Sequence, residues 1–164
     1  MKSKSGFTIV ELIVTISVIA ILASISLVTY SLIQRDARDN TRRGNANTIA
    51  TALERFYEKN GEYPSVKGIV NNFGGNTGPA VAAMLGINTS DLLMPRLPSG
   101  ETNALHNGTT HMSDYILYTS YNAVDDVHCQ NGPTGGCDEF TIKYLEESGT
   151  EVTIVSRHKG HPTS

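Results

Sequence analysis

The pattern of hydrophobic and polar positions divides the chain into an apolar stretch, an amphipathic stretch and a mixed remainder. Residues 12–33 contain no charge, proline or glycine. At about 1.5 Å of rise per residue, a helix of this length reaches roughly 33 Å, enough to cross the hydrocarbon layer of a membrane. Residues 35–60 are polar with a helical period, and residues 61–164 mix short apolar runs with turn residues. We therefore expect a membrane-spanning helix, its amphipathic continuation and a globular domain.

The amphipathic stretch predicts a helix that continues to about Lys59. Asn60-Gly61 and Pro64 predict its end, because the first pair favours left-handed conformations and proline cannot continue a helix. Gly44 is expected to bend or melt the helix, since glycine costs about 1 kcal/mol relative to alanine. We expect one exposed face with Asn45, Thr48, Glu54, Arg55 and Glu58, and one apolar face with Ala46, Ile49, Ala50, Leu53, Phe56 and Tyr57.

The last part of the chain predicts strands at residues 115–122, 139–145 and 151–157. The second and third form a hairpin through a turn at residues 147–150. Residues 65–113 are rich in loop signals, with short helices expected at 80–85 and 91–94. The predicted fold class is α+β, with a long N-terminal α-helix packed against a small antiparallel sheet within residues 115–157.

Glu11 is the charged residue at the start of the apolar run. A carboxylate carried to the bilayer centre costs up to roughly 2.5–3.5 kcal/mol, so its presence indicates a function. Lys2 and Lys4 precede the run and favour a cytoplasmic N-terminus. A cluster of positive charges after the run argues partly against this orientation, although acidic neighbours dilute it; the residues are Arg35, Asp36, Arg38, Asp39, Arg42 and Arg43.

The segment GFTIVELIVTISVIAILASI, which starts at Gly6, resembles the class III signal segment of type IV pilins and pseudopilins. The resemblance implies that a prepilin peptidase cuts between Gly6 and Phe7 and that Phe7 becomes N-methylated. Residues 1–6 would be the leader and residues 7–34 the transmembrane and assembly helix, in a pilin fold. The new amine of Phe7 and Glu11 are four residues apart, which places them on one face of a helix.

In the family, that glutamate is thought to pair with the terminal amine of a neighbouring subunit, so Phe7 and Glu11 are the expected assembly residues. GEYP at residues 61–64 resembles the helix-exit motif of pseudopilins and many pilins. The alternative is a single-pass anchor in which Glu11 merely lies at the membrane interface.

Composition limits the function. The formal net charge is −3, and a mildly acidic chain is not built for bulk nucleic-acid binding. The sequence has neither a phosphate-binding glycine motif before a helix nor a nucleophile elbow, so we do not expect an enzyme. The chain ends in a basic tail with Arg157, His158, Lys159 and His161. The tail is weak evidence for DNA binding, because it lacks interleaved aromatic residues. The alternative is a solvated chain end.

Cys129 and Cys137 bracket a turn-rich loop and are expected to pair outside the cytoplasm. Closing so short a loop would contribute somewhat under about 3 kcal/mol. The spacing does not fit zinc, and free thiols or a metal are the alternatives.

Carboxylates flank this loop at Asp125, Asp126, Asp138 and Glu139. Calcium binds in such oxygen-rich settings, and major pseudopilins of type II secretion are similar in binding calcium in their C-terminal loops. The spacing of these carboxylates does not match a known ligand pattern. The alternative is a solvated acidic loop. No other cofactor is expected. The histidines are scattered and do not predict a metal site; they are His106, His111, His128, His158 and His161.

These observations predict a structural subunit of a type IV pilus-like filament that serves adhesion, motility or DNA uptake. Its partners would be other pilins, the prepilin peptidase, an assembly platform protein and an ATPase. The precursor would cross the inner membrane once, and the mature chain would enter an extracellular or periplasmic filament. The alternatives are a pseudopilin of a type II secretion or competence system, and a monomeric membrane-anchored binding domain for which Gly6 and Glu11 are dispensable.

Overall fold

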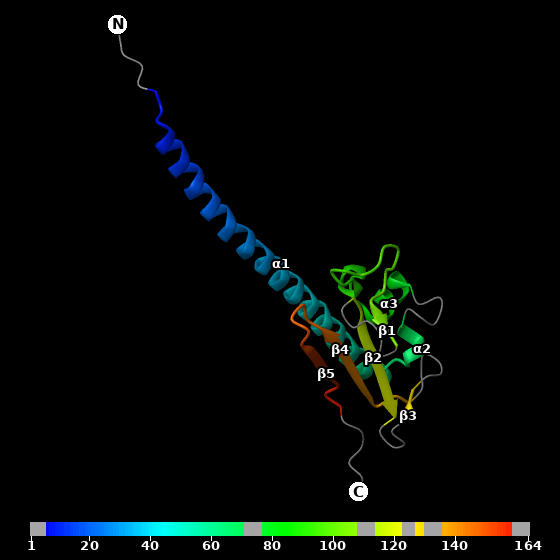
Figure 1. Ribbon diagram of the computed structural model, residues 1–164. Coiled ribbons are helices and arrows are strands. Elements are labelled where there is room, and N and C mark those ends of the chain that lie inside the picture. Colours follow the sequence, from blue (N-terminus) through cyan, green and yellow to red (C-terminus); the bar gives the residue numbers. More distant parts are fainter. Residues whose placement is uncertain (1–5, 71–76, 108–113, 123–126, 130–135, 159–164) are drawn as a thin grey trace. The chain divides into compact units, whose positions relative to one another are not determined.

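The computed structural model describes residues 6–70, 77–107, 114–122, 127–129 and 136–158. The chain forms two compact units, Met1–Ala37 and Arg38–Ser164, which are described separately. Helix α1 (Ile9–Asn60) contributes its first part to one unit and its second part to the other (Figure 1).

Helix α1 ends where the sequence predicts. The N–H of Gly61 donates to the carbonyl of Tyr57 at 2.7 Å. Gly61 has a φ of +78°, a left-handed conformation that side-chain-bearing residues rarely adopt. The helix is continuous through Gly44, so the expectation of a melted segment there is wrong. The cost of one glycine is small, and the buried neighbours Arg42 and Ala46 hold this turn in the folded unit.

The sheet lies in the second unit and has the strand order β1-β2-β4-β5 (Figure 1). Strands β2 (Ile116–Asn122), β4 (Glu139–Leu145) and β5 (Glu151–Val155) are antiparallel neighbours, as predicted. Two short strands, β1 (Leu105–His106) and β3 (Val127–His128), both pair with β2.

The expectation of a purely antiparallel sheet is wrong at β1, which runs parallel to β2 with Leu105 opposite Ile116. A strand of two residues is too short to produce an alternating pattern, so the sequence could not reveal it.

Short helices connect α1 to the sheet. Helix α3 (Gly78–Leu85) and the 3₁₀ helix η2 (Thr89–Leu92) lie close to the expected positions. Helix α2 (Val66–Ile69) was not predicted, because a single turn has no periodicity to detect.

One hydrophobic core joins the second part of α1 to the sheet and the connecting segments. Alternate residues of β4 are buried, which confirms the predicted pattern, and Val152 and Ile154 of β5 are half-buried against this core. The predicted apolar face of α1 is also confirmed. Its fully buried members are Ala46, Ile49 and Leu53, and its partly buried members are Ala50, Phe56 and Tyr57.

Two charged residues of α1 depart from the predicted pattern. Glu54, expected on the exposed face, is only 8% exposed, and Arg42 is only 2% exposed. Helical periodicity classifies charges as solvent-facing, whereas both of these have polar partners from distant parts of the sequence. The α+β class with a long N-terminal helix is confirmed.

Candidate functional site

The expected processing and assembly residues lie at the start of α1. The backbone N–H and the hydroxyl of Thr8 both donate to Glu11 Oε2, at 2.9 and 2.8 Å. The N–H of Glu11 donates back to Thr8 Oγ1 at 3.3 Å. This reciprocal arrangement is a capping box, which satisfies N–H groups that have no partner in the first helical turn. Glu11 therefore has a local structural role that our sequence analysis missed, although the Thr-x-x-Glu spacing carries its signal.

Gly6 and Phe7 precede the helix and are accessible. Phe7 is 84% exposed, and a Cβ added at Gly6 would meet nothing within 4 Å. Neither residue is covered by another part of the described chain. Because α1 begins at Ile9, Phe7 precedes the helix in the uncut chain, and the expected placement of Phe7 and Glu11 on one helical face of the processed chain stays a prediction.

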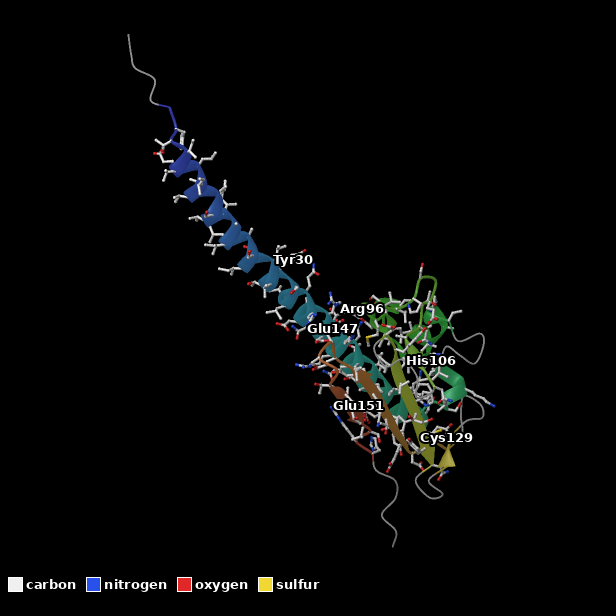
Figure 2. The ribbon with its side chains drawn as sticks, in the orientation of Figure 1. Tyr30, Arg96, His106, Cys129, Glu147 and Glu151 are labelled. Atoms are coloured by element: carbon white, nitrogen blue, oxygen red, sulfur yellow. The ribbon has the colours of Figure 1, made fainter. Side chains whose placement is uncertain are left out.

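The first part of α1 presents apolar side chains around its circumference (Figure 2). Between Ile9 and Ile33, its large apolar residues are 50–77% exposed. Hydroxyl groups in this stretch donate at 2.7–3.0 Å to main-chain carbonyls three or four residues earlier, so they need no outside partner. By length and composition, this helix can cross a membrane.

A cluster of charged residues surrounds Glu147, in the turn between β4 and β5. We call it the Glu147 cluster; its members are Arg38, Asp39, Arg42, Arg96 and Glu147. Figure 2 labels Glu147 and Arg96. Arg38 donates from Nε to Oε1 at 3.0 Å and from Nη2 to Oε2 at 3.3 Å. Arg42 Nη2 donates to Oε1 at 2.9 Å, and Arg96 Nη2 lies 3.3 Å from Oε2. The N–H of Glu147 donates to Asp39 Oδ1 at 2.9 Å, which ties the turn to α1 a second time.

The guanidinium groups keep Glu147 ionised. Hydrogen bonds from Arg38, and then from Arg42, lower the pKa of the Glu147 carboxyl to about 2, although its burial acts in the opposite direction. The Arg38 and Arg42 spacing on one helical face could have suggested a shared partner, but nothing in the sequence pointed to Glu147.

Glu54 forms a second polar centre. Its Oε2 accepts a hydrogen bond from the Tyr63 hydroxyl, and its Oε1 accepts one from the N–H of Arg157, both at 2.8 Å. His158 Nε2 lies 3.8 Å from Oε2, and its ring stacks on Tyr57 with the centroids 4.3 Å apart. Burial, and then the bond to Glu54, raises the pKa of Tyr63. This centre fastens the end of β5 to α1.

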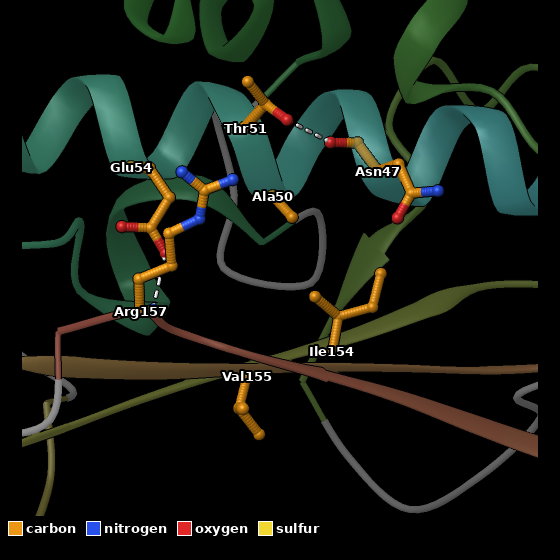
Figure 3. Close-up of a pocket in the computed structure, with 7 residues that line it drawn as sticks. All are labelled: Asn47, Ala50, Thr51, Glu54, Ile154, Val155 and Arg157. Carbon is orange, nitrogen blue, oxygen red and sulfur yellow. Dashed lines mark hydrogen bonds between the residues drawn. The ribbon is translucent and has the colours of Figure 1, made fainter.

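A pocket of about 210 Å³ lies beside this centre, between α1 and β5 (Figure 3). Two of its polar side chains bond within the fold: Glu54 accepts from the N–H of Arg157, and the Thr51 hydroxyl donates to the carbonyl of Asn47 at 2.8 Å. Its lining offers no pairing of a nucleophile with a base. The lining residues are Asn47, Ala50, Thr51, Glu54, Ile154, Val155 and Arg157.

Cys129 and Cys137 are both buried thiols, and each lies close enough to influence the pKa of the other. Burial raises the pKa of Cys137 to about 12 and also raises that of Cys129. Both are anchored to the segment after α1: Tyr63 donates its N–H to the Cys137 carbonyl at 2.8 Å, and Val66 to the Cys129 carbonyl at 2.9 Å. The disulfide stays a prediction.

The expected calcium ligands lie only partly within the residues that the structure describes, so the calcium site stays a prediction. Asp138 and Glu139 are half-buried, whereas Asp125 and Asp126 lie outside the described residues. Among the residues described, no group of three or more histidine, cysteine, aspartate or glutamate side chains could hold a metal ion.

The histidines are equally dispersed where they are described. The ring of His106 packs against Tyr115 with the centroids 4.8 Å apart, and His158 belongs to the Glu54 centre. His111, His161, Lys159 and the side chain of His128 lie outside the described residues.

Comparison with known proteins identifies one motif. The prokaryotic N-terminal methylation motif matches residues 1–27, which include Gly6, Phe7 and Glu11. No curated protein and no solved structure matches the chain. The motif belongs to structural proteins rather than enzymes, and here it lies on a helix that can cross a membrane. The match makes residues 1–27 similar to the N-terminal segment of prepilins, the precursors of type IV pilin-like and pseudopilin-like proteins.

Proposed function

We propose that the chain is the precursor of a structural subunit of a type IV pilus-like filament. The observation that carries this proposal is a methylation motif on a helix whose large apolar side chains between Ile9 and Ile33 are at least half exposed. Such a surface is stable against lipid or against other apolar helices. The apolar surface of this helix would contact lipid in the precursor and the helices of neighbouring subunits in the filament.

Processing follows from the motif. A prepilin peptidase would cut the accessible bond between Gly6 and Phe7 and methylate the new amine. Thr8 and Glu11 both remain in the mature chain, so the capping box would survive the cut.

Glu11 would then act in assembly. A carboxylate among packed apolar helices is costly when unpaired, and the terminal amine of a neighbouring subunit would neutralise it. Wrong registers would leave both charges unpaired. A platform protein and an ATPase would drive transfer from the inner membrane into an extracellular or periplasmic filament.

The second unit would form the filament's coat, where it would serve adhesion, motility or DNA uptake. A pseudopilin of a type II secretion or competence system is the second candidate, favoured by the GEYP sequence at residues 61–64. Length measurements on native filaments distinguish the two, because a pseudopilus is short and remains within the envelope.

The capping box makes a discriminating experiment available. Glu11→Gln removes the charge but keeps an acceptor suitable for a capping box, whereas Thr8→Ala removes the hydroxyl contact and keeps the charge. If Glu11 acts through charge, we expect Glu11→Gln to abolish sheared filaments and Thr8→Ala to retain them.

Unchanged filament yield in Glu11→Gln would contradict a charge-based assembly role. If filaments are also absent from the unaltered strain and the chain stays monomeric in the membrane, the anchored binding domain becomes the better account.

A further inference from the structure

The two edges of the sheet differ in how well they are protected. At one edge lies β1, which has only two residues. At the other lies β5, which has five residues, four of them β-branched, and Glu151 as its only charge (Figure 1). Proteins usually protect an exposed edge with lysine, proline, a bulge or a very short strand. Strand β5 contains no lysine or proline, and its register with β4 runs without a bulge, so it is an unprotected edge.

Three residues of β5 turn their backbone groups to the open side of the sheet. The N–H of Ser156 donates to the carbonyl of Phe140, next to β5, at 3.0 Å. In an antiparallel pair every second residue forms such bonds, so Val152 and Ile154 also face β4. The residues between them direct their N–H and C=O groups outwards, where the described part of the chain offers no partner; they are Glu151, Thr153 and Val155. Such a row of donors and acceptors is a template for another strand.

The pocket between α1 and β5 lies at this open edge. It measures about 210 Å³, and the side chains of Ile154 and Ala50, both partly buried, point towards each other in it (Figure 3). Successive side chains of a strand alternate between the two faces of a sheet. A strand added beside β5 would therefore place every second side chain on the face of Ile154, over α1. An apolar side chain suits this position.

A cation stands at the end of the same pocket. Arg157 uses its backbone N–H to donate to Glu54 Oε1 at 2.8 Å, but its exposed guanidinium has no hydrogen-bond or ion-pair partner among the described residues. Figure 3 shows this side chain extending from the end of β5 towards α1. A guanidinium with its N–H groups available can bind a carboxylate through two hydrogen bonds.

We propose that β5 is the docking site for an extended segment of a different protein. The segment pairs with the open edge of β5 as a further strand, lays alternate apolar side chains over the pocket and places an acidic side chain beside Arg157. The backbone bonds give affinity, and the pocket and Arg157 give specificity. The inference concerns the second unit alone and does not depend on filament formation.

A second copy of this chain matches the edge less well. If its β5 paired with this one, Val152 and Ile154 would lie on the face of the pocket. Glu151 lies on the opposite face of the strand, as the alternating burial shows. The copy would therefore leave Arg157 without a carboxylate.

A random peptide library displayed on phage, selected against the full chain in detergent, tests the proposal. We expect enriched peptides to alternate β-branched apolar residues with polar ones and to carry aspartate or glutamate near one end. Thr153→Pro removes an N–H from the open edge, where proline is tolerated because no bond to β4 is lost. It should weaken peptide binding at least about tenfold, whereas Thr153→Ala keeps the N–H and should bind within about twofold of the unaltered chain.

Further variants separate the contributions. Val155→Pro repeats the backbone test at a second outward-facing position if circular dichroism shows that Thr153→Pro does not fold. Arg157→Gln should weaken binding of the acidic peptides several-fold and leave their amide counterparts unchanged. Arg55→Gln is its control, because Arg55 is an exposed cation of α1 outside this pocket.

N-methylation of a selected synthetic peptide gives the clearest signature. Methyl groups on one set of alternate amides should abolish binding, and methyl groups on the other set should leave it, because only one set faces β5. No enrichment of peptides, equal binding to the proline variants, or equal effects of the two methylated sets would each overturn the proposal. In sedimentation velocity, a dimer of the full chain that Thr153→Pro abolishes would mean that a second copy occupies the edge, and would also overturn it.

Discussion

Arg42 Nη2 donates to Glu147 Oε1 at 2.9 Å, although 105 residues separate them in the sequence. Their side chains are 2% and 9% exposed, so this ion pair lies almost wholly out of solvent. It joins the second part of α1 to the turn of the β4–β5 hairpin. Because a buried ion pair is costly to break, this contact fixes where the hairpin lies on the helix.

Glu147→Gln should lower the free energy of unfolding by about 2 kcal/mol, since it removes a charged partner from the buried guanidinium of Arg42, which keeps its contact with Asp39. Urea denaturation of the full chain in detergent, followed by circular dichroism, measures this. Glu151→Gln is the matched control, because Glu151 pairs with Lys143 at 2.9 Å on the surface, with both side chains about two-fifths exposed. We expect its effect to stay below about 1 kcal/mol. Equal effects in the two variants would contradict a stabilising role of the buried Arg42–Glu147 ion pair.

The same carboxylate predicts a pH dependence. The pKa of Glu147 in the folded chain, about 2, lies below its ordinary value of 4.5. A lowered pKa means that the unfolded chain binds the proton more readily, so the stabilisation is fully present above about pH 4.5 and is lost as pH falls towards 2. Urea midpoints taken through this range should fall less steeply in Glu147→Gln than in the unaltered chain. If the urea midpoints of the two chains fall equally with decreasing pH, protonation of Glu147 does not contribute to this loss of stability.

Two glycines provide an opposed pair of substitutions. A Cβ at Gly78, the first residue of α3, would overlap the carbonyl group of Thr102, so Gly78→Ala should destabilise the chain by several kcal/mol, on the scale of other severe steric changes. A Cβ at Gly44 would meet nothing within 4 Å, so Gly44→Ala should stabilise α1 by up to about 1 kcal/mol. Thermal melts of both variants test whether stability falls in Gly78→Ala and rises in Gly44→Ala. Destabilisation by Gly44→Ala would indicate a need for flexibility in that turn.

The buried cysteines should resist alkylation in the native reduced chain. With the pKa of Cys137 raised to about 12, the reactive thiolate is scarce near neutral pH. Iodoacetamide should label both residues quickly in urea and slowly without it, as read by mass spectrometry. Protein from the native host should carry the disulfide and take no label even in urea. Rapid labelling of both cysteines without urea would contradict their burial in the folded chain.

Much of the fold follows from local pattern. The alternation of Phe140, Ile142 and Tyr144 gave β4 its exact bounds, and Asn60-Gly61 gave the end of α1. The antiparallel hairpin followed from its turn residues. These features depend on near neighbours in the sequence, which a pattern can report.

The remaining features depend on distant partners. Glu54 was predicted to be exposed, and Arg42 is a charge four residues before Ala46 of the buried face; both are buried beside polar partners that include Tyr63, Arg157, Asp39 and Glu147. The Glu147 cluster was therefore missed. At the N-terminus, the motif was readable because Gly6, Phe7, Thr8 and Glu11 are close in sequence; the capping role of Glu11 was missed, although the same Thr-x-x-Glu spacing signals it.

The central claim is that this chain is a precursor that is processed for assembly. Intact mass spectrometry of the protein from its native host tests this claim directly. The protein is taken from membranes and from sheared surface material, in strains with and without the peptidase. The account predicts loss of residues 1–6 and a gain of one methyl group, dependent on the peptidase. A chain that keeps its first residues in every fraction would contradict it.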